Sequence, residues 1–255
     1  MAEAGEEPRL DLTRRSVALD RAASLFERGL ELVAALSDCA FVGVAAGSEY
    51  TIAVGADGSL WAWGRNDAGQ LGLGDHADRH RPTRVGVDTD WASVAAGYDH
   101  TFGLKRDGSL WGWGSNDCNQ LGLGDVDWTT RPVRVGEESD WLTVCRTDES
   151  TFALKRDGSL WGWGRNDAGQ LGVGDFEDRP HPARVGDDSD WLAVSCENWR
   201  TLALKGDGSM WCWDADIGPF AENTDPPQFT RVGFDSDWIS VAAGSTHDFA
   251  IKRDG

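Results

Sequence analysis

The sequence lacks the features that would place it among membrane or exported proteins. It contains only 2 Met and 2 Tyr in 255 residues, and no stretch approaches the roughly 20 apolar residues that a membrane-spanning helix requires. The first residues are acidic, whereas an export signal begins with basic residues followed by an apolar run. We therefore expect a soluble protein that resides in the cytoplasm.

Basic residues are scarce as well. Lys and Arg number 24 against 43 Asp and Glu, which gives a formal net charge of -19. Because affinity for a phosphate backbone comes largely from Lys and Arg, this balance argues against a nucleic-acid partner and favours a basic protein. With 40% hydrophobic and 10% aromatic residues, the chain still has enough apolar surface for a folded core.

Signatures of metal sites and enzymes are missing. Five cysteines form an odd set without a C-x-x-C pair: Cys39, Cys118, Cys145, Cys196 and Cys212. This pattern indicates neither a disulfide framework nor a zinc site, so we expect reduced thiols and no metal. There is also no G-x-x-x-x-G-K-[ST], H-E-x-x-H or G-x-S-x-G motif. The sequence therefore predicts a protein that is not an enzyme and that needs no cofactor.

What the sequence does contain is a repeat. The motif D-G-S-L-W-x-W-G begins at Asp57, Asp107 and Asp157, and a weaker copy begins at Asp207, so the step is fifty residues. We divide the chain into residues 1–40, four units at 41–90, 91–140, 141–190 and 191–237, and a partial unit at 238–255. A period of this length is typical of β-propellers and other repeat folds.

Each unit has the pattern of four short strands. Apolar or alternating runs are separated by an Asp-Gly turn and by a glycine-rich connection such as Gly64–Asp75. We therefore predict an all-β fold made of β-propeller blades, each with four antiparallel strands. Tryptophans two residues apart share one face of a strand and are interpreted as structural core. These are Trp61, Trp63, Trp111, Trp113, Trp161, Trp163, Trp211 and Trp213.

The two ends of the chain depart from this pattern. Apolar residues recur at steps of three and four between about Asp11 and Leu36, which predicts an amphipathic helix that either caps the first blade or binds a partner. The last unit contains only two predicted strands, so we expect about four and a half blades in an open arc or incomplete ring. The C-terminal open blade edge or the N-terminal helix would then be the place for homo-oligomer formation.

Candidate functional residues lie where the copies of the unit disagree, because shared positions build the scaffold and variable loops decorate one face. The loop between the first and second strands differs in every unit, and in a propeller these loops surround one mouth of the central channel. Drift of a loop without function is the alternative explanation. The candidate partner-binding residues are Tyr50, His100, Asp148, Glu149, Trp199, Arg200 and His247.

Two segments carry a resemblance to a known family. The segment W-G-R-N-D-A-G-Q-L-G-V-G-D (Trp163 to Asp175) and the pattern H-T-x-x-L-K-x-D-G (His100 to Gly108) resemble the regulator of chromosome condensation repeat, and the match extends over about Phe41 to Gly255. The resemblance implies a propeller, usually of seven blades. It does not imply one function, because the family includes exchange factors, chromatin binders, parts of ubiquitin ligases and a plant ultraviolet-B photoreceptor.

The hypothesis that we favour is a protein-interaction scaffold that binds a partner through the loops on one propeller face. Guanine-nucleotide exchange on a small GTPase is an alternative, although the family's eukaryotic exchange factors use a wedge inserted into one blade and the spacing here shows no insertion. Ultraviolet-B sensing is a second alternative, because Asn198–Thr201 is similar to the photoreceptor's G-W-R-H-T motif but lacks its Gly and His. Chromatin binding conflicts with the charge.

Overall fold

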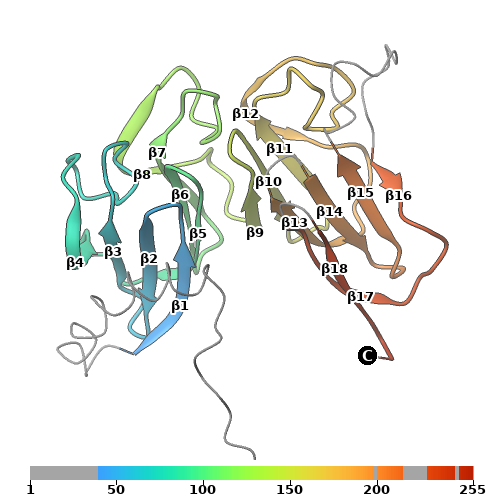
Figure 1. The fold of residues 1–255 in the computed structure, drawn as a ribbon, viewed down its shortest axis with the longest axis horizontal. Helices are drawn as coiled ribbons and strands as arrows, with labels where there is room; N and C mark the ends of the chain where they lie inside the picture. The colour runs from blue at the N-terminus through green and yellow to red at the C-terminus, as the bar shows by residue number, and fades with distance from the viewer. Residues whose placement is uncertain (1–39, 198–199, 215–228, 245–246, 255) are drawn as a thin grey trace, which may run out of the picture. The chain divides into compact units, whose positions relative to one another are not determined.

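The computed structural model describes residues 40–197, 200–214, 229–244 and 247–254 (Figure 1). These residues form eighteen β-strands and no helix, so none of their segments is a helix long and apolar enough to span a membrane. The predicted N-terminal helix and Trp199 lie outside the described residues. The prediction of an all-β fold is confirmed.

The strands form four antiparallel sheets of four strands and one hairpin, in chain order. Blade 1 contains β1 (Phe41–Ala46), β2 (Tyr50–Gly55), β3 (Leu60–Gly64) and β4 (Arg79–Val85), and blade 2 contains β5 (Trp91–Ala96), β6 (His100–Lys105), β7 (Leu110–Ser115) and β8 (Trp128–Arg134). Blade 3 contains β9 (Trp141–Arg146), β10 (Ser150–Lys155), β11 (Leu160–Gly164) and β12 (Arg179–Arg184). Blade 4 contains β13 (Trp191–Glu197), β14 (Arg200–Lys205), β15 (Met210–Asp214) and β16 (Thr230–Arg231), and the hairpin pairs β17 (Trp238–Ala242) with β18 (Phe249–Lys252).

Neighbouring blades pack through their first two strands. β5 contacts β1 and β2, β9 contacts β5 and β6, β13 contacts β9 and β10, and β17 contacts β13 and β14. Each blade thus lies between its neighbours in chain order, as expected for propeller-like blades. The open arc or incomplete ring stays a prediction.

The D-G-S-L-W motif forms a hydrogen-bonded turn that also orients a tryptophan. In blade 1, Asp57 Oδ1 accepts hydrogen bonds from Ser59 N at 2.9 Å and from Ser59 Oγ at 2.5 Å. Ser59 Oγ in turn accepts one from Trp61 Nε1 at 2.8 Å. Gly58 has φ of 81°, and a Cβ there would lie 2.1 Å from Thr89 O, so only glycine fits. The bonds from Ser59 lower the pKa of Asp57.

The glycine-rich connection is organised by one buried asparagine. Asn66 Nδ2 donates to Asp75 O at 2.8 Å and to Ala77 O at 3.1 Å, while Asn66 Oδ1 accepts from Leu71 N at 2.9 Å. The side chain therefore replaces several backbone partners that a winding loop cannot supply. Asn166 makes the same set of bonds in blade 3.

This connection also docks the next blade. Gln70 O accepts hydrogen bonds from Trp113 Nε1 at 2.9 Å and from Thr101 Oγ1 at 2.8 Å, so a backbone atom of blade 1 binds two side chains of blade 2. Gly72 allows this approach, because a Cβ there would lie 2.8 Å from Trp113 Nε1. Gln120 O binds the corresponding side chains of blade 3 in the same way.

The paired tryptophans differ in burial. The second member of each pair is fully buried in three blades, as Trp113, Trp163 and Trp213. The first member is half-buried in every blade, and so is Trp63 in blade 1. In blades 2 to 4, the half-buried first tryptophan is covered by a lysine of the same blade.

Lys105 lies between two tryptophan rings. Its Nζ is 5.0 Å from the ring centroid of Trp91 and 4.7 Å from that of Trp111, and it forms ion pairs with Asp88 at 2.7 Å and Asp90 at 3.1 Å. Cation–π attraction and two carboxylates thus compensate for the burial of the ammonium group. The arrangement recurs around Lys155 and Lys205.

Two cysteines of adjacent blades form a disulfide, so the expectation of reduced thiols was wrong for this pair. Cys145 of β9 is bonded to Cys196 of β13, with Cα atoms 5.7 Å apart. The two residues are 51 positions apart and meet because β9 and β13 are the first strands of consecutive blades. Cys118 is a free thiol.

Candidate functional site

The loops that vary between units lie at one end of the blades, together with the start of each glycine-rich connection. Backbone hydrogen bonds join the two, from Arg65 N to Glu49 O at 2.9 Å and from Arg165 N to Glu149 O at 3.0 Å. We define the inner-rim surface as the exposed and half-exposed charged or aromatic residues of the loops between first and second strands in blades 1 to 3. These are Glu49, Tyr98, Asp99, Asp148 and Glu149.

Two of the predicted site residues are buried and do not belong to this surface. Tyr50 Oη donates to His100 O at 2.5 Å and lies 3.0 Å from Thr101 Oγ1, so the phenol of blade 1 docks on blade 2. Burial raises the pKa of Tyr50 well above its usual range. The structure thus gives both Tyr50 and His100 a role in the contact between blades rather than direct access to a partner.

His100 is buried without a hydrogen-bond partner for either ring nitrogen among the described residues. The Asp99 carboxylate is 3.8 Å from Nδ1, which is beyond hydrogen-bond distance, and Arg146 and Asp148 are the other charged groups that act on the ring. Burial lowers the pKa of His100, so the imidazole is neutral at pH 7. Its ring stacks edge-on against Phe102 at 5.8 Å.

The remaining predicted residues are accessible where they are described. Asp148 is exposed, and half-exposed Glu149 forms an ion pair with Arg165 at 2.6 Å. Arg200 lies 3.2 Å from Asp248, and exposed His247 packs edge-on against Phe249 at 5.0 Å. A partner-binding role for these residues stays a prediction.

Two residues of this region were missed by sequence reasoning. Tyr98 is 53% exposed and lies beside Arg65 of blade 1. Arg146 donates from Nε to Ala96 O at 2.6 Å and pairs with Glu197 at 3.7 Å, so it links three blades. Arg146 stands where units 1 and 2 have Ala and unit 4 has Cys, and this departure is the signal that could have found it.

The electrostatics of the inner-rim surface are acidic. Each of its nearby arginines, Arg65, Arg146 and Arg165, already contacts a carboxylate, whereas Asp148 projects into solvent. A surface with engaged cations and exposed carboxylates has a negative electrostatic potential. No group of three or more His, Cys, Asp or Glu side chains among the described residues is arranged to hold a metal ion.

Comparison with curated proteins finds short but close matches. A segment of 42 residues is 57% identical to the ultraviolet-B receptor UVR8 of Arabidopsis thaliana, and it covers 16% of this chain and 10% of the receptor. A segment of the same length is 48% identical to human HERC3, a probable E3 ubiquitin-protein ligase, and covers 4% of it. The matches thus span a tenth or less of these relatives.

Solved structures match over most of the chain. Human WBSCR16 superposes with a TM-score of 0.74 at 20% identity, over 86% of this chain and 61% of that one. Yeast Prp20, solved with Kap60 bound, gives 0.70 at 23% identity, over 84% and 55%. At these identities the likeness concerns the fold, and the chain spans little more than half of their length.

The family model named regulator of chromosome condensation (RCC1) repeat matches residues 57–104, 107–154 and 157–204. A second model of the same description matches residues 41–70 and 91–120. The three segments of the first model alone cover more than half of the sequence. This chain therefore belongs to the regulator of chromosome condensation repeat family.

Proposed function

We propose that the protein is a non-enzymatic interaction module that binds a protein partner through its inner-rim surface. The observation that carries the proposal is the contrast between scaffold and loops. The Gln–Trp docking bonds recur at fixed positions in successive blades, whereas the loops between first and second strands present different, accessible side chains such as Tyr98 and Asp148. Invariant scaffolds with variable loops are the usual design of repeat proteins that bind other proteins.

The partner that this surface favours is basic. Exposed carboxylates steer a cationic partner and add specificity, and an exposed tyrosine supplies contact area at low entropic cost. Prp20 has been described with its binding to Gsp1p and histones as well as with Kap60. We extend protein binding to this chain by analogy, with the cytoplasm as the compartment in which we expect it.

Substitutions on the inner-rim surface test the proposal. Tyr98→Ala combined with Asp148→Lys removes the exposed ring and reverses one charge, while Val87→Ala, at an 84% exposed site after β4, is the matched control. Quantitative affinity capture from cytoplasmic extract should give proteins that the double variant loses at least tenfold and that the control retains. Equal capture by all three proteins would contradict the proposed surface.

Guanine-nucleotide exchange is the alternative with structural motivation, because Prp20 has been described with its binding to Gsp1p. Blades 1 to 3, which are described without gaps, contain no inserted segment. A nucleotide-release assay with several small GTPases separates exchange from binding alone. For ultraviolet-B sensing, the decisive measurement is whether oligomer size changes under illumination.

A further inference from the structure

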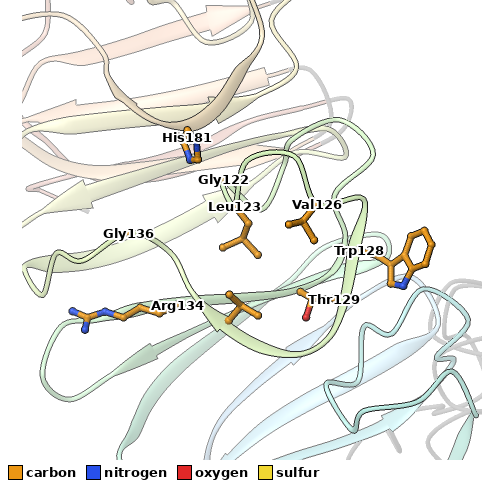
Figure 2. A pocket seen from close by; sticks show the side chains of 9 residues that line it. Gly122, Leu123, Val126, Trp128, Thr129, Arg134, Gly136 and His181 are labelled. Atoms are coloured by element: carbon orange, nitrogen blue, oxygen red, sulfur yellow. The ribbon is translucent and has the colours of Figure 1, made fainter.

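An apolar pocket lies beside β8, the fourth strand of blade 2. Its volume is about 420 Å³, and its lining comes from the loop before β8, from β8 itself and from β12 of blade 3 (Figure 2). Three apolar side chains of this wall are accessible: Val126 is 43% exposed, Trp128 is 56% exposed and Val133 is 40% exposed. Clustered apolar side chains of this size on a surface usually mark a binding site.

The tryptophan stands where the neighbouring units need an aspartate. In blades 1 and 3, Asp78 and Asp178 accept hydrogen bonds from Asn66 N at 2.8 Å and Asn166 N at 2.7 Å, which close the glycine-rich connection. In blade 2, the corresponding Asn116 N donates to the backbone oxygen of residue 127 at 2.7 Å. Loop closure therefore no longer depends on the side chain at position 128, and Trp128 is not required by the scaffold.

An ion pair of the other units is also missing from blade 2. Asp75 pairs with Arg79 at 2.6 Å, and Asp175 pairs with Arg179 at 2.5 Å. The equivalent positions of blade 2 hold Asp125 and Thr129, so the carboxylate is kept while the arginine is lost. Blade 2 thus gains an exposed aromatic ring and loses the cation that would neutralise the acid beside it.

Charged groups of both signs lie at the pocket, because Arg134 lines it and several residues next to the lining in the sequence are acidic. The guanidinium of Arg134 is held by the oxygens of the turn after β8, at 2.6 Å from Glu137 O and 2.8 Å from Ser139 Oγ. His181 of β12 rests on Gly124, where a Cβ would lie 2.8 Å from its ring, and Gly124 N donates to Pro180 O at 2.9 Å. The exposed acids around the pocket are Asp125, Asp127, Glu137 and Glu138.

We propose that this pocket is a second protein-binding site, which takes a basic segment of another protein with an aliphatic or aromatic side chain as its anchor. The anchor packs against Val126 and Val133, and a neighbouring Lys or Arg lies over the Trp128 indole within reach of Asp125. This chemistry follows from the exposed tryptophan, which is the type of residue that dominates binding energy at interfaces, and from the unneutralised carboxylate.

Defined peptides test the proposal without knowledge of the natural partner. Three synthetic twelve-residue peptides share an alanine-glycine background: one has a central Leu-Phe pair flanked by four Lys, one has the same pair flanked by four Glu, and one has Ala-Ala flanked by four Lys. Titration is followed by the indole N–H signals in ¹⁵N-correlated NMR spectra, in which Trp128→Phe assigns the signal of Trp128.

The variant for this test is Trp128→Asp, because units 1 and 3 carry Asp at the same position and the scaffold accepts it there. Phe176→Asp is the matched control, at a 45% exposed apolar site in the corresponding loop of blade 3. We expect the peptide with Leu-Phe and Lys to shift the Trp128 signal and to bind Trp128→Asp at least tenfold more weakly, with Phe176→Asp and Tyr98→Ala unchanged.

The other two peptides separate the two parts of the proposal. Both should bind at least fivefold more weakly than the first, because one lacks the charge and the other lacks the anchor. Equal binding of all three peptides, no shift of the Trp128 signal at millimolar peptide, or undiminished binding to Trp128→Asp would each overturn the site. An effect of Tyr98→Ala alone would place peptide binding on the inner-rim surface instead.

Discussion

Lys105→Met measures how much a cation between two indole rings contributes to the free energy of unfolding. Methionine keeps most of the aliphatic packing but removes the charge, so Trp91 and Trp111 lose a cation within 5.0 Å of each ring centroid. A desolvated cation–π contact contributes about 2 kcal/mol. The two ion pairs add about 0.2–1 kcal/mol each, since the side chains of Asp88 and Asp90 are 51% exposed. Burial of the Lys105 ammonium group has a desolvation penalty that the methionine variant avoids. After this penalty is subtracted, we expect Lys105→Met to lower the free energy of unfolding by about 2–3 kcal/mol.

Lys252→Met is the matched control within the same chain. Lys252 has the same kind of acidic partners, but its side chain is 32% exposed against 10% for Lys105, and it lies over the Trp238 ring at 4.8 Å. Water screens these contacts, so this substitution should cost less than about 1 kcal/mol. Urea unfolding at pH 7, followed by tryptophan fluorescence, compares the two. An equal or smaller cost at Lys105 would refute the view that its burial strengthens the interaction.

Three further outcomes are expected. Because the folded-state pKa of His100 lies below its unfolded value, the folded protein binds fewer protons, and its stability should fall as pH decreases below about 6.5, with a slope of at most about 1.4 kcal/mol per pH unit. His100→Leu should flatten this profile in urea titrations at several pH values. Gly72→Ala should lower the free energy of unfolding by about 3 kcal/mol, because it adds a clash with the next blade to a left-handed φ of 73°. The control Gly174→Ala, with φ of 94° and no atom within 4 Å of its Cβ, should lower it by about 1–2 kcal/mol. Equal losses in chemical denaturation would contradict the role assigned to the close approach at Gly72. Reduction of the inter-blade disulfide, verified by peptide mapping, should lower stability by about 2–4 kcal/mol, and an unchanged urea midpoint would argue against its formation.

The strands and turns of this fold could be predicted because the sequence repeats them in register. The motif that begins at Asp57 recurs every fifty residues, and each copy contains the turn residues and the alternation that a hairpin requires. Contacts between blades are different, because they join residues far apart in the sequence. The bond between Cys145 and Cys196 illustrates the limit, because cysteine spacing reveals only local pairs, whereas packing of consecutive first strands brings together residues 51 positions apart.

The candidate site was predicted less well, for a related reason. Disagreement between units correctly directs attention to the loops, but it does not distinguish a side chain that faces solvent from one that faces the next blade. Tyr50 and His100 are the buried first residues of the second strands β2 and β6, so their variation serves blade contacts. Trp128 was not selected at all, because its significance appears only when the hydrogen bond of Asp78 in the neighbouring blade is known.

The docking bond between Gln70 O and Trp113 Nε1 has an evolutionary consequence. The acceptor is a backbone carbonyl in one unit and the donors belong to its successor, so unit 2 has donors toward unit 1 and an acceptor toward unit 3. Such a unit can pack against another copy of itself through the hydrogen bonds that it already contains. In-register duplication of a whole unit would therefore lengthen the array in a single genetic step, because the copied blade would carry both the acceptor and the donors of the docking bond.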